Sequence, residues 1–257
     1  MRIVIKIGTS TLTHTATGHL NIRQVEELCK VISDIKNAGN EIIIVSSGAI
    51  GMGVGKLGLR KRPEDIPTKQ AAAAVGQCEL MYTYDKLFGK YGHTVAQLLI
   101  TGEDVESDTR HTNFTNTLSR LLELGAIPII NENDTVATNE IVIGDNDTLA
   151  AIVAESIRAD KLILLSDIDG LYTADPHTDP NAKLIRHAGK VDDAIIALAG
   201  GSSCSFGTGG MVTKLQAAMI CLACGCDMVI ANGNNPANLY AIVDGEHIGT
   251  TFSEKYL

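Results

Sequence analysis

The sequence contains no tryptophan, and aromatic residues make up only 4% of its 257 residues. The interior must therefore be filled by aliphatic and small side chains, which suits helices that pack closely on a parallel sheet. The N-terminal MRIVIKIGTSTL lacks the apolar run of a signal peptide, and no stretch approaches the ~20 apolar residues of a membrane span. We therefore expect a cytoplasmic protein with no membrane association.

Basic residues are also scarce, since 21 Lys and Arg face 30 Asp and Glu and leave a net charge of −9. This balance argues against binding to nucleic acid or to a membrane surface, whereas a small anionic substrate needs only a local positive pocket. The sequence has six cysteines, which in a reducing compartment are expected to be buried thiols. Cys221, Cys224 and Cys226 resemble a partial metal cluster, but no histidine is near, so a metal site there is disfavoured.

Short apolar runs alternate with patterns typical of helices. The runs predict strands at 2–7, 41–46, 93–100, 126–130, 161–166 and 227–231, with 247–252 as a further candidate. Helices are expected at 21–38, 67–88, 109–124, 146–159 and 210–224, and a small hairpin outside the sheet at 135–143. This alternation predicts one α/β domain over residues 1–257, a three-layer α/β/α sandwich with a mainly parallel central sheet.

Polar, glycine-rich loops follow the expected strands, and the carboxyl ends of parallel strands meet at one edge of a sheet. KIGTS (6–10) places Lys6 at the end of an apolar strand, where a lysine is costly unless it meets an anion. GTGGMVTK (207–214) leads into a helix whose N-terminus can bind a phosphate, with Lys214 one turn in. Taken singly, an edge-strand lysine that reaches solvent explains the first motif equally well, and an ordinary helix entry is the simpler explanation of the second.

SSGAIGMGVG (46–55) matches two nucleotide motifs only in part. Its glycine spacing and Leu57 do not fit a Walker loop, and LRKRPEDIP follows in place of the helix that a dinucleotide fingerprint requires. We expect instead a glycine-rich loop that closes over a small anionic substrate, with a flexible surface loop as the alternative. SDIDGLY (166–172), after another apolar strand, would bring Ser166 and Asp167 to the same edge.

NENDTVATNEIVIGDND (131–147) gathers acids and amides, while no Lys or Arg occurs from Leu121 to Ile157. A solvated polar loop is the simplest interpretation, and we retain it for Glu132, Asn139 and Glu140. Two lysines, two glycine-rich segments and two polar loops at one edge are, however, what a phosphoryl-transfer site needs.

In order along the chain, KIGTS, SSGAIG, the NEND and GDND pair, SDIDGLY and GTGGMVTK resemble the signatures of the amino acid kinase family, and within it the glutamate 5-kinase branch. The resemblance runs from Arg2 to about Phe252. It implies the amino acid kinase fold and ATP-dependent phosphorylation of the side-chain carboxylate of L-glutamate, the first step of proline synthesis. Many bacterial members carry a C-terminal PUA domain, which we expect this form to lack.

The resemblance also assigns roles to individual residues. Lys6 and Lys214 would be catalytic and contact the transferring phosphoryl group, and Asp147 would orient both lysines. Residues before about 160 would mainly bind glutamate, through Ser47, Asp134 and Asn146. Residues after about 160 would mainly bind ATP, together with Lys6, through Ser166, Asp167, Thr208, Gly209, Gly210, Met211, Val212, Thr213 and Lys214.

The chemistry of this reaction fits the residues. A carboxylate with an ordinary pKa of about 4.3 is ionised at neutral pH, so it needs no general base. It must instead approach an anionic γ-phosphate, and two like charges ~4 Å apart repel by roughly 4 kcal/mol at an effective dielectric near 20. Two lysines, a helix N-terminus and Mg²⁺ would offset this repulsion, although the sequence singles out no Mg²⁺ ligand.

The resemblance further implies a homo-oligomer, feedback inhibition by proline and hand-over of the product to glutamate-5-semialdehyde dehydrogenase. The nearest alternatives are family members that act on acetylglutamate, aspartate, carbamate or a nucleoside monophosphate. A catalytically silent sensor of an amino acid or nucleotide is the alternative from a different class. The intact Lys6, Asp147 and Lys214 argue against such a sensor.

Overall fold

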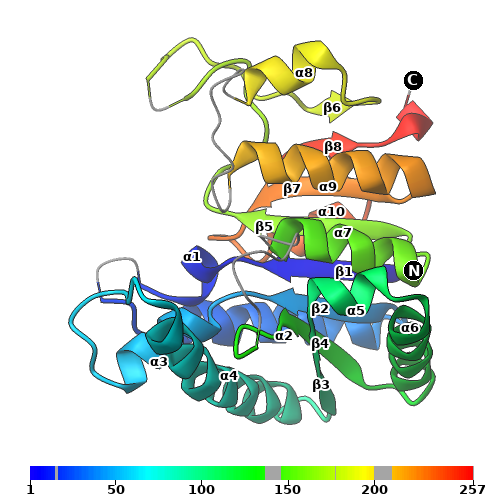
Figure 1. Cartoon of the computed structure of the whole chain (residues 1–257). Helices are drawn as coiled ribbons and strands as arrows, with labels where there is room; N and C mark the ends of the chain where they lie inside the picture. Colours follow the sequence, from blue (N-terminus) through cyan, green and yellow to red (C-terminus); the bar gives the residue numbers. More distant parts are fainter. Residues whose placement is uncertain (15–16, 137–145, 177, 200–209, 257) are drawn as a thin grey trace.

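The computed structural model describes residues 1–14, 17–136, 146–176, 178–199 and 210–256. In these residues eight strands form one sheet in the order β3-β4-β2-β1-β5-β7-β8-β6 (Figure 1). The strands are β1 (Arg2–Ile7), β2 (Glu41–Ser46), β3 (Val95–Ile100), β4 (Ile127–Glu132), β5 (Lys161–Ser166), β6 (His187–Ala188), β7 (Asp227–Asn232) and β8 (Thr250–Phe252).

The first six strands in the sheet order, β3 to β7, run parallel to one another. β8 is antiparallel to β7, and β6 is parallel to β8, so the sheet changes direction only at this end. The predicted mainly parallel α/β sandwich is therefore confirmed. Its polar strand ends lie together, because parallel strands end at the same edge.

The helices of the described residues form the two outer layers. They are α1 (Thr9–Leu12), α2 (Ile22–Asn37), α3 (Ala49–Lys56), α4 (Ile66–Gly89), α5 (Gly102–Glu106), α6 (Asp108–Glu123), α7 (Asn146–Ser156), α8 (Asp193–Leu198), α9 (Met211–Cys224) and α10 (Asn238–Val243), with a short 3-10 turn at Glu254–Tyr256. None of them is both long and apolar enough to cross a membrane.

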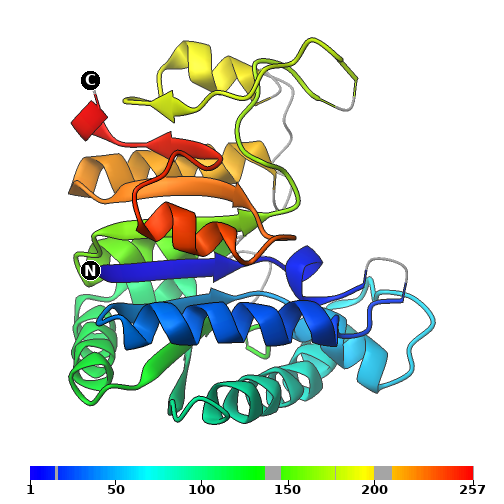
Figure 2. The same cartoon turned by 180° about the vertical axis from the view of Figure 1, so that it is seen from behind.

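The central parallel strands contribute alternate residues to two separate hydrophobic cores, because successive side chains point to opposite faces of a sheet. On one face Val4 and Ile43 pack under α6, α7 and α9. On the other face Ile3 and Ile42 pack under α2, α4 and α10. Figures 1 and 2, seen from opposite sides, show α7 and α9 over one face and α2 and α10 over the other.

The segment 49–56, predicted as a glycine-rich loop, is helix α3. A glycine inside a helix costs up to about 1 kcal/mol relative to alanine, so the sequence pattern disfavours a helix here. The structure shows what compensates. A Cβ on Gly53 would collide with the carbonyl of Ala72, and one on Gly76 with the carbonyl of Ala49. The backbones of α3 and α4 are therefore in direct contact.

The remaining differences concern short elements and ends. The sequence analysis did not predict α1, α5, α8, α10 or the two-residue β6, each too short to show a clear periodicity. β4 continues two residues past its predicted end, to Glu132, and α7 ends at Ser156, three residues early. Of the expected hairpin at 135–143, residues 137–143 lie outside the described part of the chain.

Candidate active site

Lys6 lies on β1 and points to the face that α7 and α9 cover. Val4 belongs to the core on that face, and the two-residue period of a strand places Lys6 on the same side. The residue is only 9% exposed. An edge-strand lysine reaching solvent is therefore the wrong interpretation, since β1 is a central strand, between β2 and β5.

Asp147 is the anion that Lys6 meets. One carboxylate oxygen of Asp147, Oδ1, lies 2.6 Å from Lys6 Nζ, and the other, Oδ2, lies 2.9 Å from Lys214 Nζ. All three residues are buried, with Asp147 only 1% exposed. Burial alone would raise the pKa of Asp147, but the ammonium groups of Lys6 and then Lys214 outweigh burial and hold that pKa below its ordinary value.

These three residues come from elements far apart in the sequence: β1, the first turn of α7 and the first turns of α9. Thr213 joins them, because its hydroxyl lies 3.2 Å from Asp147 Oδ2 and 2.9 Å from the carbonyl of Gly210. Gly210 caps α9 without a side-chain hydrogen bond. Among the described residues no side chain caps this helix start, which suits the binding of a phosphate beside Lys214.

The rest of the expected ATP loop is described only in part. Met211 and Val212 open α9, with Val212 exposed, while Thr208 and Gly209 lie outside the described residues. Ser166 ends β5, and its hydroxyl donates to Asp167 Oδ1 at 3.1 Å. Because β5 is the parallel neighbour of β1, Ser166 and Asp167 lie at the same sheet edge as Lys6.

Asn146, next to Asp147 in the sequence, belongs to a second group of polar side chains. Its Nδ2 lies 2.8 Å from Ser47 Oγ and 3.1 Å from Asn131 Oδ1. Asn131 Nδ2 in turn donates to Gln77 Oε1 at 2.9 Å. The structure therefore brings the predicted Ser47 and Asn146 into direct contact, and it links Asn146 to two buried amides that the sequence analysis did not single out.

Asp134 lines a small cavity together with Glu132, Gln77 and Ala49. The cavity measures about 10 Å³, room for about one water molecule, so an amino acid that enters must widen it. Burial raises the pKa of Asp134, and Arg62 offsets this in part. Burial and the charge of Asp134 raise the pKa of Glu132. Interpreting Glu132 as a solvated loop residue was therefore wrong.

Gln77 and Asn131 are the site residues that the sequence analysis missed. Gln77 is a long polar side chain on the buried face of the Ala-rich helix α4, and it is only 7% exposed. Such a residue is costly unless its amide has a partner, which is the signal that could have identified it. Asn131 directly follows the apolar run 126–130 and is 2% exposed.

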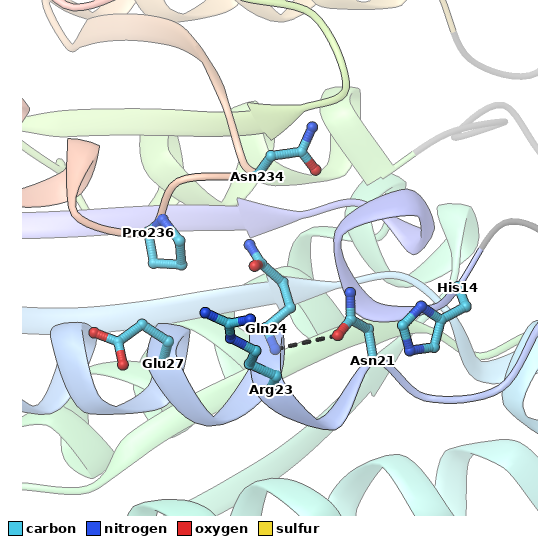
Figure 3. A pocket seen from close by; sticks show the side chains of 7 residues that line it. All are labelled: His14, Asn21, Arg23, Gln24, Glu27, Asn234 and Pro236. Atoms are coloured by element: carbon cyan, nitrogen blue, oxygen red, sulfur yellow. Dashed lines mark hydrogen bonds between the residues drawn. The ribbon is translucent and has the colours of Figure 1, made fainter.

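A larger cavity of about 530 Å³ lies away from these residues, between the start of α2 and the loop after β7 (Figure 3). Arg23 and Glu27 of α2 line it together with His14 and Asn234, all four exposed. Gln24 lies at its centre in Figure 3 and donates to the carbonyl of Gly233 at 2.5 Å. This mixed lining does not select one class of ligand, and it includes none of the predicted site residues.

Comparisons with known proteins agree with the geometry. A protein named glutamate 5-kinase from Clostridium perfringens (strain 13 / Type A) is 52% identical over 99% of this chain and 96% of its own length. One of that name from Caldanaerobacter subterraneus subsp. tengcongensis is 53% identical over 98% of this chain but 68% of its own length.

The fold agrees as well. The structure of a carbamate kinase from Giardia lamblia bound to AMP-PNP aligns with a TM-score of 0.70 at 15% identity, over 99% of this chain and 98% of that one. The model of the amino acid kinase family matches residues 1–232. The chain therefore belongs to the amino acid kinase family, and within it to the glutamate 5-kinases.

Proposed function

We propose that this chain transfers the γ-phosphoryl group of ATP to the side-chain carboxylate of L-glutamate, which yields L-glutamyl 5-phosphate for proline synthesis. The ion-paired Lys6, Asp147 and Lys214 at the carboxyl edge of the sheet carry the proposal. The identity of the glutamate 5-kinase relatives over nearly the full chain supports the choice of substrate.

The net charge of the triad formed by Lys6, Asp147 and Lys214 suits the binding of a phosphoryl group. Two ammonium groups and one carboxylate leave a formal charge of +1 in a buried place, which a phosphoryl oxygen can neutralise. Lys6 and Lys214 would hold the γ-phosphoryl group from two sides as the bond to ADP breaks and the bond to glutamate forms. Asp147 would fix the separation of the two lysines and offset their mutual repulsion, without touching the substrate.

The glutamate would bind beside this triad, through Ser47, Asp134 and Asn146. Asp134 can accept from the ammonium group, and Asn146 Oδ1 is buried and has no hydrogen-bond partner among the described residues. Because Asn146 and Asp147 are adjacent on the first turn of α7, they couple glutamate binding to the phosphoryl site. The residues before about 160 would thus mainly bind glutamate, and Ser166, Asp167 and the start of α9 would mainly bind ATP.

Mg²⁺ would neutralise part of the charge on the ATP phosphates. The described residues contain no group of three acids, histidines or cysteines that could hold a metal ion by itself. Mg²⁺ commonly keeps several waters and binds through the substrate phosphates, and an ion held in that way would be compatible with this edge. Lys6, Lys214 and the α9 N–H groups would then bind the phosphate oxygens that such an ion leaves uncovered.

The experiment is an acceptor panel with the purified chain, ATP and Mg²⁺. L-glutamate, acetylglutamate, aspartate, carbamate and UMP are each tested for ADP formation, and hydroxylamine traps an acyl phosphate as a hydroxamate. We expect ADP and hydroxamate in equal amounts with glutamate and a background rate with the others. No ADP with glutamate, or a faster rate with another acceptor, would contradict the proposal.

The reaction also suggests how the enzyme is used in the cytoplasm. An acyl phosphate hydrolyses readily, so a glutamate-5-semialdehyde dehydrogenase is the expected consumer of the product. Inhibition by proline and assembly into a homo-oligomer are further proposals that rest on the family alone. The same assay with added proline, and light scattering of the purified chain, test them directly.

A further inference from the structure

Three side-chain amides form a continuous hydrogen-bonded chain from α7 through β4 to α4. Asn146 Nδ2 lies 3.1 Å from Asn131 Oδ1, and Asn131 Nδ2 lies 2.9 Å from Gln77 Oε1. Asn131 and Gln77 are both buried, at 2% and 7% exposure. These hydrogen bonds connect Asn146, which is predicted to bind the substrate, to helix α4 on the opposite side of the sheet.

The orientation of this chain is fixed by one backbone group. The N–H of Glu132 donates to Asn131 Oδ1 at 2.9 Å, and a backbone N–H can only donate. The oxygen of Asn131 is thereby identified, so its Nδ2 must face Gln77, whose facing atom must be the acceptor Oε1. By the same logic the atom of Asn146 that faces Asn131 must be the donor Nδ2.

The two outer atoms of the chain are therefore a donor and an acceptor. Gln77 Nε2 and Asn146 Oδ1 are both buried, and neither has a partner among the described residues. Because a buried polar group without a partner is costly, each of these two atoms favours binding a ligand group that satisfies it. One hydrogen-bonded row of amides thus holds a donor at one end and an acceptor at the other. The donor suits a negative group of a ligand and the acceptor suits a positive group.

Gln77 lines the same small cavity as Asp134, Glu132 and Ala49. The two carboxylates repel a carboxylate ligand and suit an ammonium group. Gln77 Nε2 offers the opposite preference, and so does α3, which begins at Ala49 and has no side-chain cap on its first-turn N–H groups. The cavity thus has an acidic part and a part rich in N–H donors.

We propose that Gln77 Nε2 donates a hydrogen bond to the α-carboxylate of the substrate, beside the N-terminus of α3. This inference rests on the proposed function and makes Gln77 a residue that determines specificity for an α-amino acid. The ammonium group binds Asp134, while Gln77 receives the α-carboxylate, and the side-chain carboxylate is left free for Lys6 and Lys214. Asn131 positions Gln77 from behind and does not itself touch the substrate.

Gln77→Glu tests this contact with a minimal change of shape. Glutamate at this position can still accept from Asn131 Nδ2 through one oxygen, while the other oxygen replaces the donor with a negative charge. The experiment compares kcat/KM for L-glutamate with kcat/KM for isoglutamine, in which a neutral amide replaces the α-carboxylate. We expect the ratio of the two to fall by about 10- to 100-fold in Gln77→Glu, with the KM for ATP unchanged.

Two further variants separate a direct contact from a structural effect. Gln97→Glu places the same charge on the exposed residue of edge strand β3 and should leave the ratio unchanged. Gln77→Met keeps the length of the side chain without a charge and should raise the KM for glutamate about 10-fold with little change in kcat. It also covers the case in which Gln77→Glu does not fold, judged by circular dichroism.

Equal losses with glutamate and isoglutamine, or no loss with either, would overturn the role of Gln77. The proposed function is tested separately, because it requires only that the wild-type chain phosphorylate glutamate. If the wild-type chain phosphorylates glutamate but both Gln77 variants keep the wild-type ratio of kcat/KM for glutamate to kcat/KM for isoglutamine, the Gln77 contact is refuted. The proposed function is then unaffected. Absence of wild-type turnover would refute the function itself.

Discussion

Asp147 and Asp134 are two carboxylates at the same edge of the sheet, yet their pKa values move in opposite directions. Asp147 is the more buried, but Lys6 and Lys214 hold its pKa below the ordinary value. Asp134 is half-buried with only the partial influence of Arg62, so burial raises its pKa. The difference shows that charge partners, more than depth, decide what a carboxylate does here.

The two positions suit different parts of one reaction. Asp147 is satisfied by permanent cations of the protein, so it can organise the phosphoryl site before any substrate arrives. Asp134 forms no ion pair among the described residues and is only partly compensated by Arg62, so the ammonium group of the substrate would best compensate its charge. Substitutions in the Lys6, Asp147 and Lys214 triad should therefore reduce kcat. Substitutions at Asp134 or in the small cavity that it lines should raise the KM for glutamate.

The largest effect is expected for Lys6→Ala and Lys214→Ala. Each removes one of the two cations that would hold the transferring phosphoryl group, and loss of such a group costs about 10²–10³ in kcat. Steady-state kinetics would show the loss with a folded protein, judged by circular dichroism. Lys190→Ala removes an exposed lysine that pairs with Asp192 on the surface and should leave kcat unchanged. Near-normal turnover in either active-site variant would exclude that lysine from the mechanism.

The next effect concerns Asp147→Asn, which leaves two buried ammonium groups without their anion. We expect kcat to fall by about 10²-fold while the KM for glutamate changes less, since in the proposed mechanism Asp147 would orient the lysines and would not bind substrate. Asp193→Asn, at an exposed acid on α8, serves as the control. A rise in the glutamate KM with kcat retained would instead make Asp147 a substrate ligand.

The same substitution should lower stability in a pH-dependent way. Because the folded pKa of Asp147 is depressed, its contribution is present above the unfolded pKa of about 3.9 and is lost as pH falls through the folded pKa. Breaking a buried ion pair costs about 3–5 kcal/mol. Urea unfolding at neutral pH should show a deficit of that order, which shrinks as the pH is lowered below about 4. A constant deficit would contradict the linkage.

A smaller effect on glutamate binding is expected from Gly76→Ala, which would disturb the small cavity at Asp134 through packing alone. A Cβ at Gly76 would collide with the carbonyl of Ala49, and overpacking of this kind typically costs about 1–3 kcal/mol. Ala49 opens α3 at the small cavity, so the KM for glutamate should rise by up to about 10-fold while the KM for ATP stays constant. Gly89→Ala, at the open end of α4, is the matched control.

Long periodic elements and the triad were accessible from the sequence. The apolar runs around Lys6 and the glycines before Lys214 predicted the strand, the helix and the shared edge, because local patterns encode them. The meeting of Lys6, Asp147 and Lys214 depends on strand order, and the roles came from the family resemblance, since composition and spacing left other interpretations open.

Contacts that depend on packing could not be predicted in this way. The glycines of α3 indicate a loop by propensity, and only its backbone contact with α4, through Gly53 and Gly76, explains why it is a helix. Gln77 and Asn131 were missed for a related reason. The two side chains bond to each other across 54 residues of sequence, Gln77 belongs to no recognisable short motif, and nothing in NEND singles out Asn131 as the residue that reaches it.

The smallest effect concerns the pH dependence of glutamate binding. Burial raises the pKa of Asp134, with Glu132 in the same cavity and Arg62 as the offsetting charge, so Asp134 takes up a proton at higher pH than an ordinary aspartate. A protonated Asp134 cannot pair with an ammonium group. The KM for glutamate should therefore rise as the pH is lowered from neutrality, and the rise should begin at a higher pH than an ordinary aspartate with a pKa of about 3.9 would give. Asp134→Asn should raise the KM at neutral pH and flatten this dependence. A slope that survives in Asp134→Asn would assign the titration to Glu132 instead.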